Sequence, residues 1–343
     1  MPCLKPEPMS ARKQIAKLMH KTPPNWQNWS GSVHCDPGHC AEPHALEEVQ
    51  AEVVRAAEEG ERLRVIGSGC SVAPLCWTDD NHMSLRRFSG LEAADVQRRR
   101  VWVRAGTTLA ELYALLAERE LALEVGPSTN WATIAGAIST ATHGSGMAFG
   151  TLSSLVTGLR LVLADGTVRQ CSRELHPQLF DAARVSLGAL GVITHVELQC
   201  VDHYRLHVVR TRVSFGETLA RLTEVRREHR NFEMFWFPYA RIVQQRWADE
   251  TRDPPAHPLN PRAMRSRFYD RALSTVARRL AQGSSQAAER AGDLLAARIR
   301  HRSAVLDAED AYHLARRTRV LQLEYAIPIE RVAETLRLLE RLI

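Results

Sequence analysis

The chain has 343 residues, of which 45% are hydrophobic and 24% charged, and its formal net charge is +6. This composition excludes a disordered or fibrous protein and predicts a folded chain long enough for two domains. The arginine-rich stretch from Arg262 to Arg302 is better explained as a solvated helix face than as a nucleic-acid-binding surface, because no nucleic-acid-binding motif accompanies it.

The cysteines and the apolar runs indicate the compartment. Seven cysteines are scattered along the chain, and an odd, dispersed set in a large protein does not indicate a disulfide framework. No apolar run approaches the roughly 20 residues that a membrane-spanning helix needs, and the N-terminus lacks the apolar stretch of a secretory signal. We expect a flexible arm at residues 1–24 on a cytoplasmic protein, with peripheral membrane association as the alternative.

The first predicted elements are a helix, a strand and a tight turn. Apolar residues recur at spacings of three and four between Ala45 and Gly60, which is the period of a helix, and Gly60 is a natural stop. An apolar strand at 63–66 then leads into the sequence GSGCS at 67–71. Two glycines in such a turn expose backbone N–H groups that suit a pyrophosphate, although the turn matches neither the Rossmann fingerprint nor a P-loop.

Two later segments also carry local signals. Thr108 and Glu111 are spaced as a capping box at the start of a helix. The apolar run at 156–163 reaches the Asp165-Gly166 turn, which predicts a hairpin.

The segment WATIAGAISTATHGSG at 131–146 is built from small residues, hydroxyls and glycine. Such a segment lets the backbone approach a ligand closely. His143 lies there among glycines, in a loop with no apolar face for a structural histidine to serve. Two glycine-rich loops that each follow apolar runs therefore predict one long, phosphate-bearing cofactor held from two sides.

After residue 203 the pattern changes to long strands that alternate with helices. A helix is expected at 216–229, and Pro328 is suited to begin the last one. The strands are expected at 205–213, 235–237, 243–247 and 320–327.

Several motifs, taken in order, resemble one known family. They are IGSGCS at 66–71, VGPSTNWATIAGAISTATHGSG at 125–146, LVLADGTV at 161–168 and LGALGVITHVEL at 187–198. Together they resemble the FAD-binding domain of the vanillyl-alcohol-oxidase superfamily, and within it the branch of gulonolactone, arabinonolactone and alditol oxidases. NWSGSVHC at 28–35 resembles the N-terminal segment of that branch, while FEMFWFPYARIVQQRWADET at 232–251 and LQLEYAIPIERV at 321–332 resemble its substrate domain.

The resemblance implies an α+β fold with a PCMH-type FAD-binding domain at 25–203 and an incomplete α+β cap domain at 204–343. It also implies oxidation of D-arabinono- or L-gulono-1,4-lactone by hydride transfer to flavin N5, with oxygen or another acceptor taking the electrons. The flavin supplies the redox chemistry and the protein positions the reactants. An alditol substrate, and a non-catalytic FAD-binding protein derived from such an oxidase, are the alternatives. Oligomeric state is not predicted.

The residues that the resemblance assigns to FAD fall into three groups, which wrap the pyrophosphate, line the cofactor from the other side, and lie near the adenine. These are Ile66, Gly67, Ser68, Gly69, Cys70 and Ser71; Ser128, Gly136, Thr140, Thr142, His143 and Gly144; and Gly191 and Ile193. Many family members have a histidine at the position of Cys70, and that histidine bonds covalently to the flavin. Cys70 cannot make this bond, so we expect non-covalent FAD. A cysteinyl thioether is the alternative, because a thiolate is a good nucleophile.

The family also carries a Glu-x-Arg pair facing the flavin and a later His-Trp-x-Lys motif, both beyond the helix begun at Pro328. The sequence in hand ends at Ile343, so we expect a C-terminally truncated form with low or no turnover, because transition-state stabilisation of this kind is worth several kcal/mol. Glu224-Val225-Arg226 has the right letters but lies in a predicted surface helix. Gln322 and Glu324 remain candidates for side chains facing the flavin, beside a plain surface role.

A cluster of possible metal ligands gives a last alternative. These are His34, Cys35, His39, Cys40 and His44. Their spacing departs from the paired ligands of structural zinc sites, so we expect no metal site.

Overall fold

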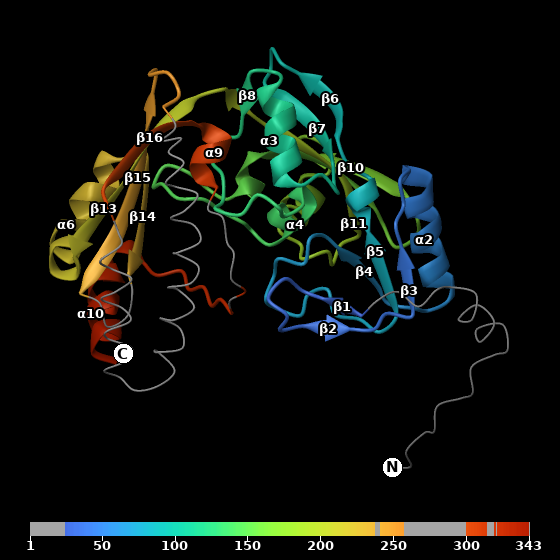
Figure 1. Ribbon diagram of the computed structural model, residues 1–343. Helices are drawn as coiled ribbons and strands as arrows, with labels where there is room; N and C mark the ends of the chain where they lie inside the picture. The colour runs from blue at the N-terminus through green and yellow to red at the C-terminus, as the bar shows by residue number, and fades with distance from the viewer. Residues whose placement is uncertain (1–24, 237–240, 257–299, 314–318, 320, 343) are drawn as a thin grey trace.

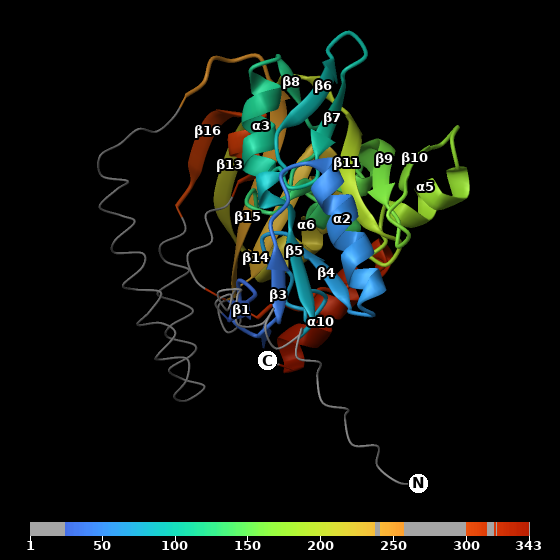
Figure 2. The same cartoon turned by 90° about the vertical axis from the view of Figure 1, so that its right-hand side faces the viewer.

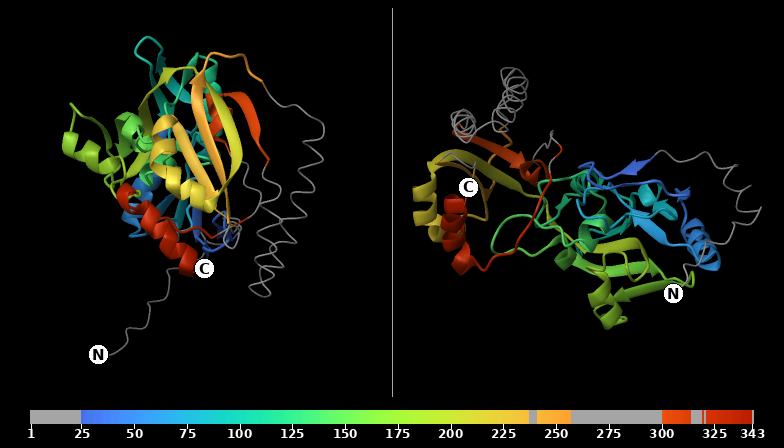
Figure 3. Two further views of the ribbon diagram at one scale, coloured as in Figure 1. Left: turned by 90° about the vertical axis from the view of Figure 1, so that its left-hand side faces the viewer. Right: turned by 90° about the horizontal axis from the view of Figure 1, so that it is seen from below.

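The structure is a computed structural model that describes residues 25–236, 241–256, 300–313, 319 and 321–342. Its helices and strands gather into two mixed groups that lie side by side (Figure 1; Figure 3). The expected arm at 1–24 and most of the arginine-rich stretch lie outside the described residues. Within the described ranges, no helix has both the length and the apolar character needed to cross a membrane.

The first group contains a small parallel sheet and a larger antiparallel one. The parallel sheet has the order β3-β5-β4, with β3 at His39–Ala41, β4 at Leu63–Ile66 and β5 at Asn81–Ser84. The antiparallel sheet has the order β10-β9-β11-β7-β6. Its strands are β6 (Leu91–Asp95), β7 (Arg100–Arg104), β9 (Val156–Val162), β10 (Val168–Ser172) and β11 (Val192–Gln199). Two short pairs complete the group, β1 (Trp26–Gln27) with β2 (His34–Cys35) and β8 (Leu121–Ala122) with β12 (Val201–Asp202).

The helices of this group cover its sheets. They are α2 (Leu46–Glu58), α3 (Leu109–Ala117), α4 (Ile134–Ser139) and α5 (Pro177–Ala183), with 3-10 turns η1 (Leu85–Arg87) and η2 (Leu152–Leu155). Figure 2 shows α2 in front of the strands, where it buries Val49, Val53 and Ala56. The capping box of Thr108 and Glu111 is confirmed at the start of α3. The hairpin β9–β10 and the helix between 45 and 60 are also confirmed.

The second group is a four-stranded antiparallel sheet of order β14-β15-β13-β16 with helices beside it. Its strands are β13 (Arg205–Ser214), β14 (Asn231–Trp236), β15 (Ile242–Thr251) and β16 (Arg302–Asp307). Its helices are α6 (Phe215–Glu228), α9 (Ala308–Tyr312), η3 (Ile329–Arg331) and α10 (Val332–Leu342). Seen from below, α6 and α10 lie on the side away from the first group (Figure 3).

The last expected strand, at 320–327, is wrong over the part that the structure describes. Residues 321–327 form no strand, although apolar and polar residues alternate there. Leu321, Leu323 and Tyr325 are each more than three-quarters exposed. The alternation is that of a strand, but a strand forms only where a partner strand pairs with it, and these residues have none among those described. The helix after Pro328 is confirmed as α10.

Candidate functional site

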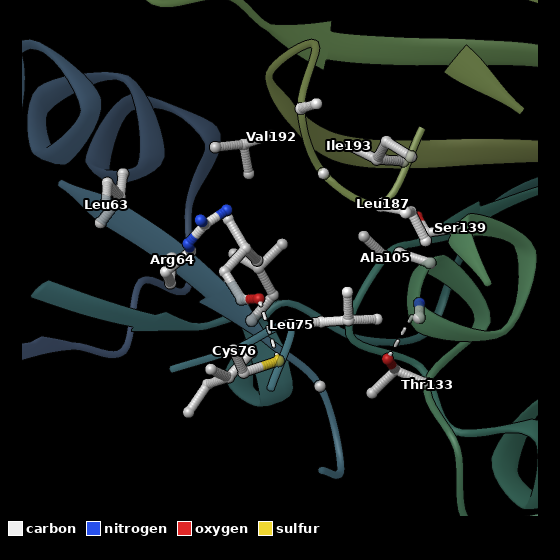
Figure 4. A pocket seen from close by; sticks show the side chains of 18 of the residues that line it. Leu63, Arg64, Leu75, Cys76, Ala105, Thr133, Ser139, Leu187, Val192 and Ile193 are labelled. Atoms are coloured by element: carbon white, nitrogen blue, oxygen red, sulfur yellow. Dashed lines mark hydrogen bonds between the residues drawn. The ribbon is translucent and has the colours of Figure 1, made fainter. Parts of the chain in front are cut away.

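A cavity of about 530 Å³ opens between the two sheets of the first group (Figure 4). Three segments that are far apart in the sequence form its walls. They are β4 with the loop at 67–71, the region of α4, and the loop at 187–193. This volume lies within the range of small-molecule sites.

The first wall is the GSGCS loop, and hydrogen bonds from two sides fix its backbone. The Ser68 hydroxyl donates to the carbonyl of Trp131 (2.5 Å), which ties the loop to the second glycine-rich segment. The Trp29 amide donates to the carbonyl of Gly69 (2.8 Å), and Gly69 has φ +65°, a conformation that favours glycine. A Cβ at Gly67 would collide with the hydroxyl of Thr133. The loop is therefore a fixed, glycine-dependent cradle of backbone.

The second wall is α4 and the residues just after it. The Thr133 hydroxyl accepts from the Gly136 amide (3.3 Å) and so caps the helix, while the Thr140 hydroxyl donates to the Gly136 carbonyl (2.9 Å). The hydroxyl of Thr142 lies 3.4 Å from that of Thr140. This side therefore offers several hydroxyl groups beside a surface of small residues, as the composition of 131–146 indicated.

The third wall is the loop that precedes β11. The Leu187 amide donates to the carbonyl of Ser139 (3.3 Å), which joins this loop to the second wall. Gly191 has φ +132°, and a Cβ there would lie 2.6 Å from the Val162 carbonyl oxygen. The backbone thus passes β9 at a distance that only glycine allows.

Only two charged side chains are among the described residues that line the cavity, Glu61 and Arg64. Burial raises the pKa of Glu61, but hydrogen bonds from Asn81 (2.7 Å) and Arg55 (3.1 Å) outweigh this and lower it overall. Burial raises the pKa of the Cys76 thiol on the same wall, against the attraction of Arg64. Glu61 is thus a partnered carboxylate, Cys76 is a neutral thiol, and the charge of Arg64 faces the cavity.

Eleven of the fourteen residues predicted to bind FAD line this cavity. They are Ile66, Gly67, Ser68, Gly69, Cys70, Ser71, Gly136, Thr140, Thr142, Gly191 and Ile193. Ser128, His143 and Gly144 do not line it. A Cβ at Gly144 would meet the Gly126 carbonyl, so this glycine allows two backbone segments to pack.

His143 instead forms a pair with one of the two catalytic candidates. Its Nε2 atom lies 2.6 Å from a carboxylate oxygen of Glu324, and its Nδ1 atom lies 2.9 Å from the Gly144 carbonyl. Both interactions raise the pKa of His143, the Glu324 contact most. The pair connects the second glycine-rich loop to the segment at 321–328. Glu324 and Gln322 lie outside the cavity wall.

A cluster around Arg230 fastens the loop after His143 to the second group. Its guanidinium donates to the hydroxyl of Tyr312 (2.6 Å) and to the Glu124 carbonyl (2.8 Å), and stacks over Phe149 at 4.3 Å. The Tyr312 hydroxyl also lies 2.9 Å from that of Tyr204. These contacts fix the two groups against each other next to the glycine-rich loop.

Other lining residues had no assignment from sequence. Thr133 has a local signal that would have found it, since a threonine before an apolar run is a common helix N-cap. Arg64, Leu187 and Leu190 carry no such signal. The described residues contain no group of three or more His, Cys, Asp or Glu side chains that could hold a metal ion, including the stretch 34–44. Among the described cysteines, Cys35, Cys40, Cys76, Cys171 and Cys200 take part in no disulfide bond.

Comparison with known proteins assigns both halves of the chain. Residues 37–172 match the family described as FAD binding domain, and residues 196–343 match D-arabinono-1,4-lactone oxidase. L-Gulono-1,4-lactone dehydrogenase of Mycobacterium tuberculosis is 33% identical over 91% of this chain and 72% of its own length. L-Gulonolactone oxidase of Bos taurus is 32% identical over 68% of this chain, and the match spans about half (53%) of that enzyme.

Solved structures agree on the fold. A structure described as solvent-stable cholesterol oxidase has a TM-score of 0.68 at 20% identity, over 80% of this chain and 57% of that one. A cholesterol oxidase from B. sterolicum has a TM-score of 0.63 at 15% identity, over 85% of this chain and 61% of that one. Such identities show the fold alone, and the α+β FAD-binding fold is confirmed. The two family matches and the relative that is 33% identical establish that the chain belongs to the family of FAD-linked sugar-lactone oxidoreductases.

Proposed function

We propose that this protein binds FAD in the cavity of the first group and oxidises a sugar-1,4-lactone, of the D-arabinono or L-gulono type. The observation that carries the proposal is the cavity itself, in which the glycine cradle, the hydroxyls of the α4 region and the 187–193 loop meet. Bound FAD supplies the hydride acceptor for a carbon that bears a hydroxyl group.

The residues fit the cofactor for physical reasons. Gly67, Ser68 and Gly69 line the cavity with the backbone of a tight turn, and backbone N–H groups in such a turn suit phosphate oxygens. The hydroxyls of Thr140 and Thr142 offer hydrogen bonds on the opposite wall. Cys70 lines the cavity where the family often has histidine, so we propose that the protein holds FAD without a covalent link. Roles for Ser128, His143 and Gly144 toward FAD stay predictions.

The candidate side chains for substrate binding lie outside the cavity wall. The His143–Glu324 pair lies beside the second glycine-rich loop and combines a carboxylate with a histidine of raised pKa. Such a pair can hold a proton close to a substrate hydroxyl. We therefore propose Glu324 as the candidate for orienting that hydroxyl through His143.

Anaerobic mixing of the FAD-loaded protein with D-arabinono-1,4-lactone or L-gulono-1,4-lactone tests the function. We expect the flavin absorbance band near ~450 nm, a property of the cofactor, to bleach with a lactone and not with buffer. An alditol such as xylitol tests the alternative substrate class. Persistence of the band with every substrate, while FAD stays bound, would refute the lactone activity and support the non-catalytic alternative. Return of the band with oxygen, or only with an artificial dye, then identifies the acceptor class.

A further inference from the structure

Arg64 is a charged residue that lines the cavity and forms no ion pair within the described part of the chain. It lies in the middle of β4, two residues before Ile66 and the glycine loop, and opposite His82 of β5. Its Nε atom is buried without a hydrogen-bond partner, and the described residues contain no ion pair for it. Figure 4 shows its guanidinium nitrogens among the side chains that line the pocket, on the side where Leu63 and Val192 lie.

Arg64 is half-buried, and a partly desolvated cation carries a cost where neither an anion nor a hydrogen bond offsets the desolvation of its buried nitrogen. The other groups on this wall do not supply the offset. The Glu61 carboxylate is already bound by Arg55 and Asn81, and the Cys76 thiol is held neutral by burial. An anionic group of a molecule bound in the cavity would supply that partner.

We infer that the Arg64 guanidinium, on the side of the cavity where Leu63 and Val192 lie, binds an oxygen of the FAD diphosphate and holds it by charge. A guanidinium is a planar fork of N–H donors that matches two phosphate oxygens at once. This places a charged determinant of affinity on β4, in addition to the loop residues that the family motif assigns. The inference rests on the proposed cofactor, and its test uses ADP as well as FAD so that the two can fail separately.

The test compares Arg64→Met and Arg64→Lys with Arg62→Met. Arg62 is an exposed residue two positions earlier, so its substitution makes the same change in net charge outside the cavity. Binding of FAD, ADP and adenosine to each protein is measured by calorimetry at low and moderate salt. A hydrogen bond to a charged group contributes about 1.5–3 kcal/mol, so Arg64→Met should weaken FAD and ADP roughly 10- to 150-fold.

Four further results are expected. Arg64→Lys keeps the charge and should lose less affinity than Arg64→Met, while Arg62→Met stays within about twofold of wild type, as expected for an exposed site. Adenosine, which has no phosphate, should bind the Arg64→Met protein as it binds wild type. Without ligand, the Arg64→Met protein should melt at the same temperature as wild type or above it, because a half-buried charge without a paired anion has been removed.

Three results would overturn the inference. Equal FAD and ADP affinity in the wild-type and Arg64→Met proteins would show that Arg64 binds no phosphate, and a parallel loss of adenosine affinity would place it on the nucleoside instead. A melting temperature of the unliganded variant well below wild type would assign Arg64 a structural role. If the wild-type protein binds ADP but not FAD, and Arg64→Met weakens ADP, the proposed function is refuted. The inference that Arg64 binds a diphosphate would still stand.

Discussion

Two glycines in the loop before β11 allow a matched test of how closely the backbone of this loop approaches β9. Gly188 has φ +76° and a Cβ added there would meet nothing within 4 Å. Gly191 has φ +132°, and a Cβ there would lie 2.6 Å from the Val162 carbonyl oxygen and 3.3 Å from its carbon. Substitution by alanine adds the same atom at both positions, but only at Gly191 does that atom meet the backbone of β9.

The expected magnitudes follow from this difference. Gly188→Ala carries only the strain of a left-handed alanine, about 1–2 kcal/mol. Gly191→Ala carries conformational strain of about 1–3 kcal/mol and, in addition, overpacking of about 1–3 kcal/mol, because a strand backbone cannot shift cheaply. Since about 1 kcal/mol moves the melting temperature by roughly 2–4 °C in a domain of 150–250 residues, we expect Gly191→Ala to lower it by about twice as much as Gly188→Ala.

Thermal unfolding of the unliganded proteins and FAD titration of each variant provide the measurements. Gly191→Ala should also weaken FAD more than Gly188→Ala, because the loop can relieve the contact only by moving the cavity wall. Equal melting temperatures and equal FAD affinities in the two variants would refute the close approach of this loop to β9.

Three other predictions address the second glycine-rich loop, the contact between the groups and the mode of flavin attachment. The contact with Glu324 is the first cause of the raised pKa of His143, so Glu324→Gln should lower that pKa in an NMR titration. In wild type, the stability that the charged pair contributes is fully present below the ordinary histidine pKa of about 6.5 and is lost as pH rises through the raised value. An unchanged pKa in the variant would show that the pair does not form. Tyr312→Phe should cost about 1–3 kcal/mol because it leaves Arg230 without one of its acceptors, whereas the control Tyr325→Phe, at a side chain that is 78% exposed, should change the melting temperature little; equal effects would count against the Arg230 cluster. Cys70→Ala should leave flavin release on acid precipitation unchanged, and flavin that stays with the wild-type pellet but not with the variant pellet would establish a thioether instead.

Local features of the fold were predictable because their signals lie within a few residues of one another. The helical period between 45 and 60, the capping box of Thr108 and Glu111, and the Asp165-Gly166 turn each depend on contacts close in sequence. The glycine loop at 67–71 was also recognisable, because small residues after an apolar strand already imply an exposed backbone.

Features that depend on distant partners could not be predicted from sequence in the same way. The alternation at 321–327 is that of a strand, yet pairing is a tertiary property and no described strand supplies it. His143 and Glu324 are 181 residues apart, so nothing local indicates their contact. Arg64 lies in a strand whose four residues are all partly buried. Because the strand shows no alternation of buried and exposed side chains, nothing in it indicates which face lines the cavity.

Hydrogen–deuterium exchange with and without FAD tests the central claim most directly, because it locates the cofactor without requiring turnover. We expect FAD to slow amide exchange at the three walls of the cavity, residues 66–71, 133–142 and 187–193, and to leave β14 and β15 unchanged. Protection confined to the second group, or no protection anywhere at saturating FAD, would contradict the assignment of this cavity as the FAD site.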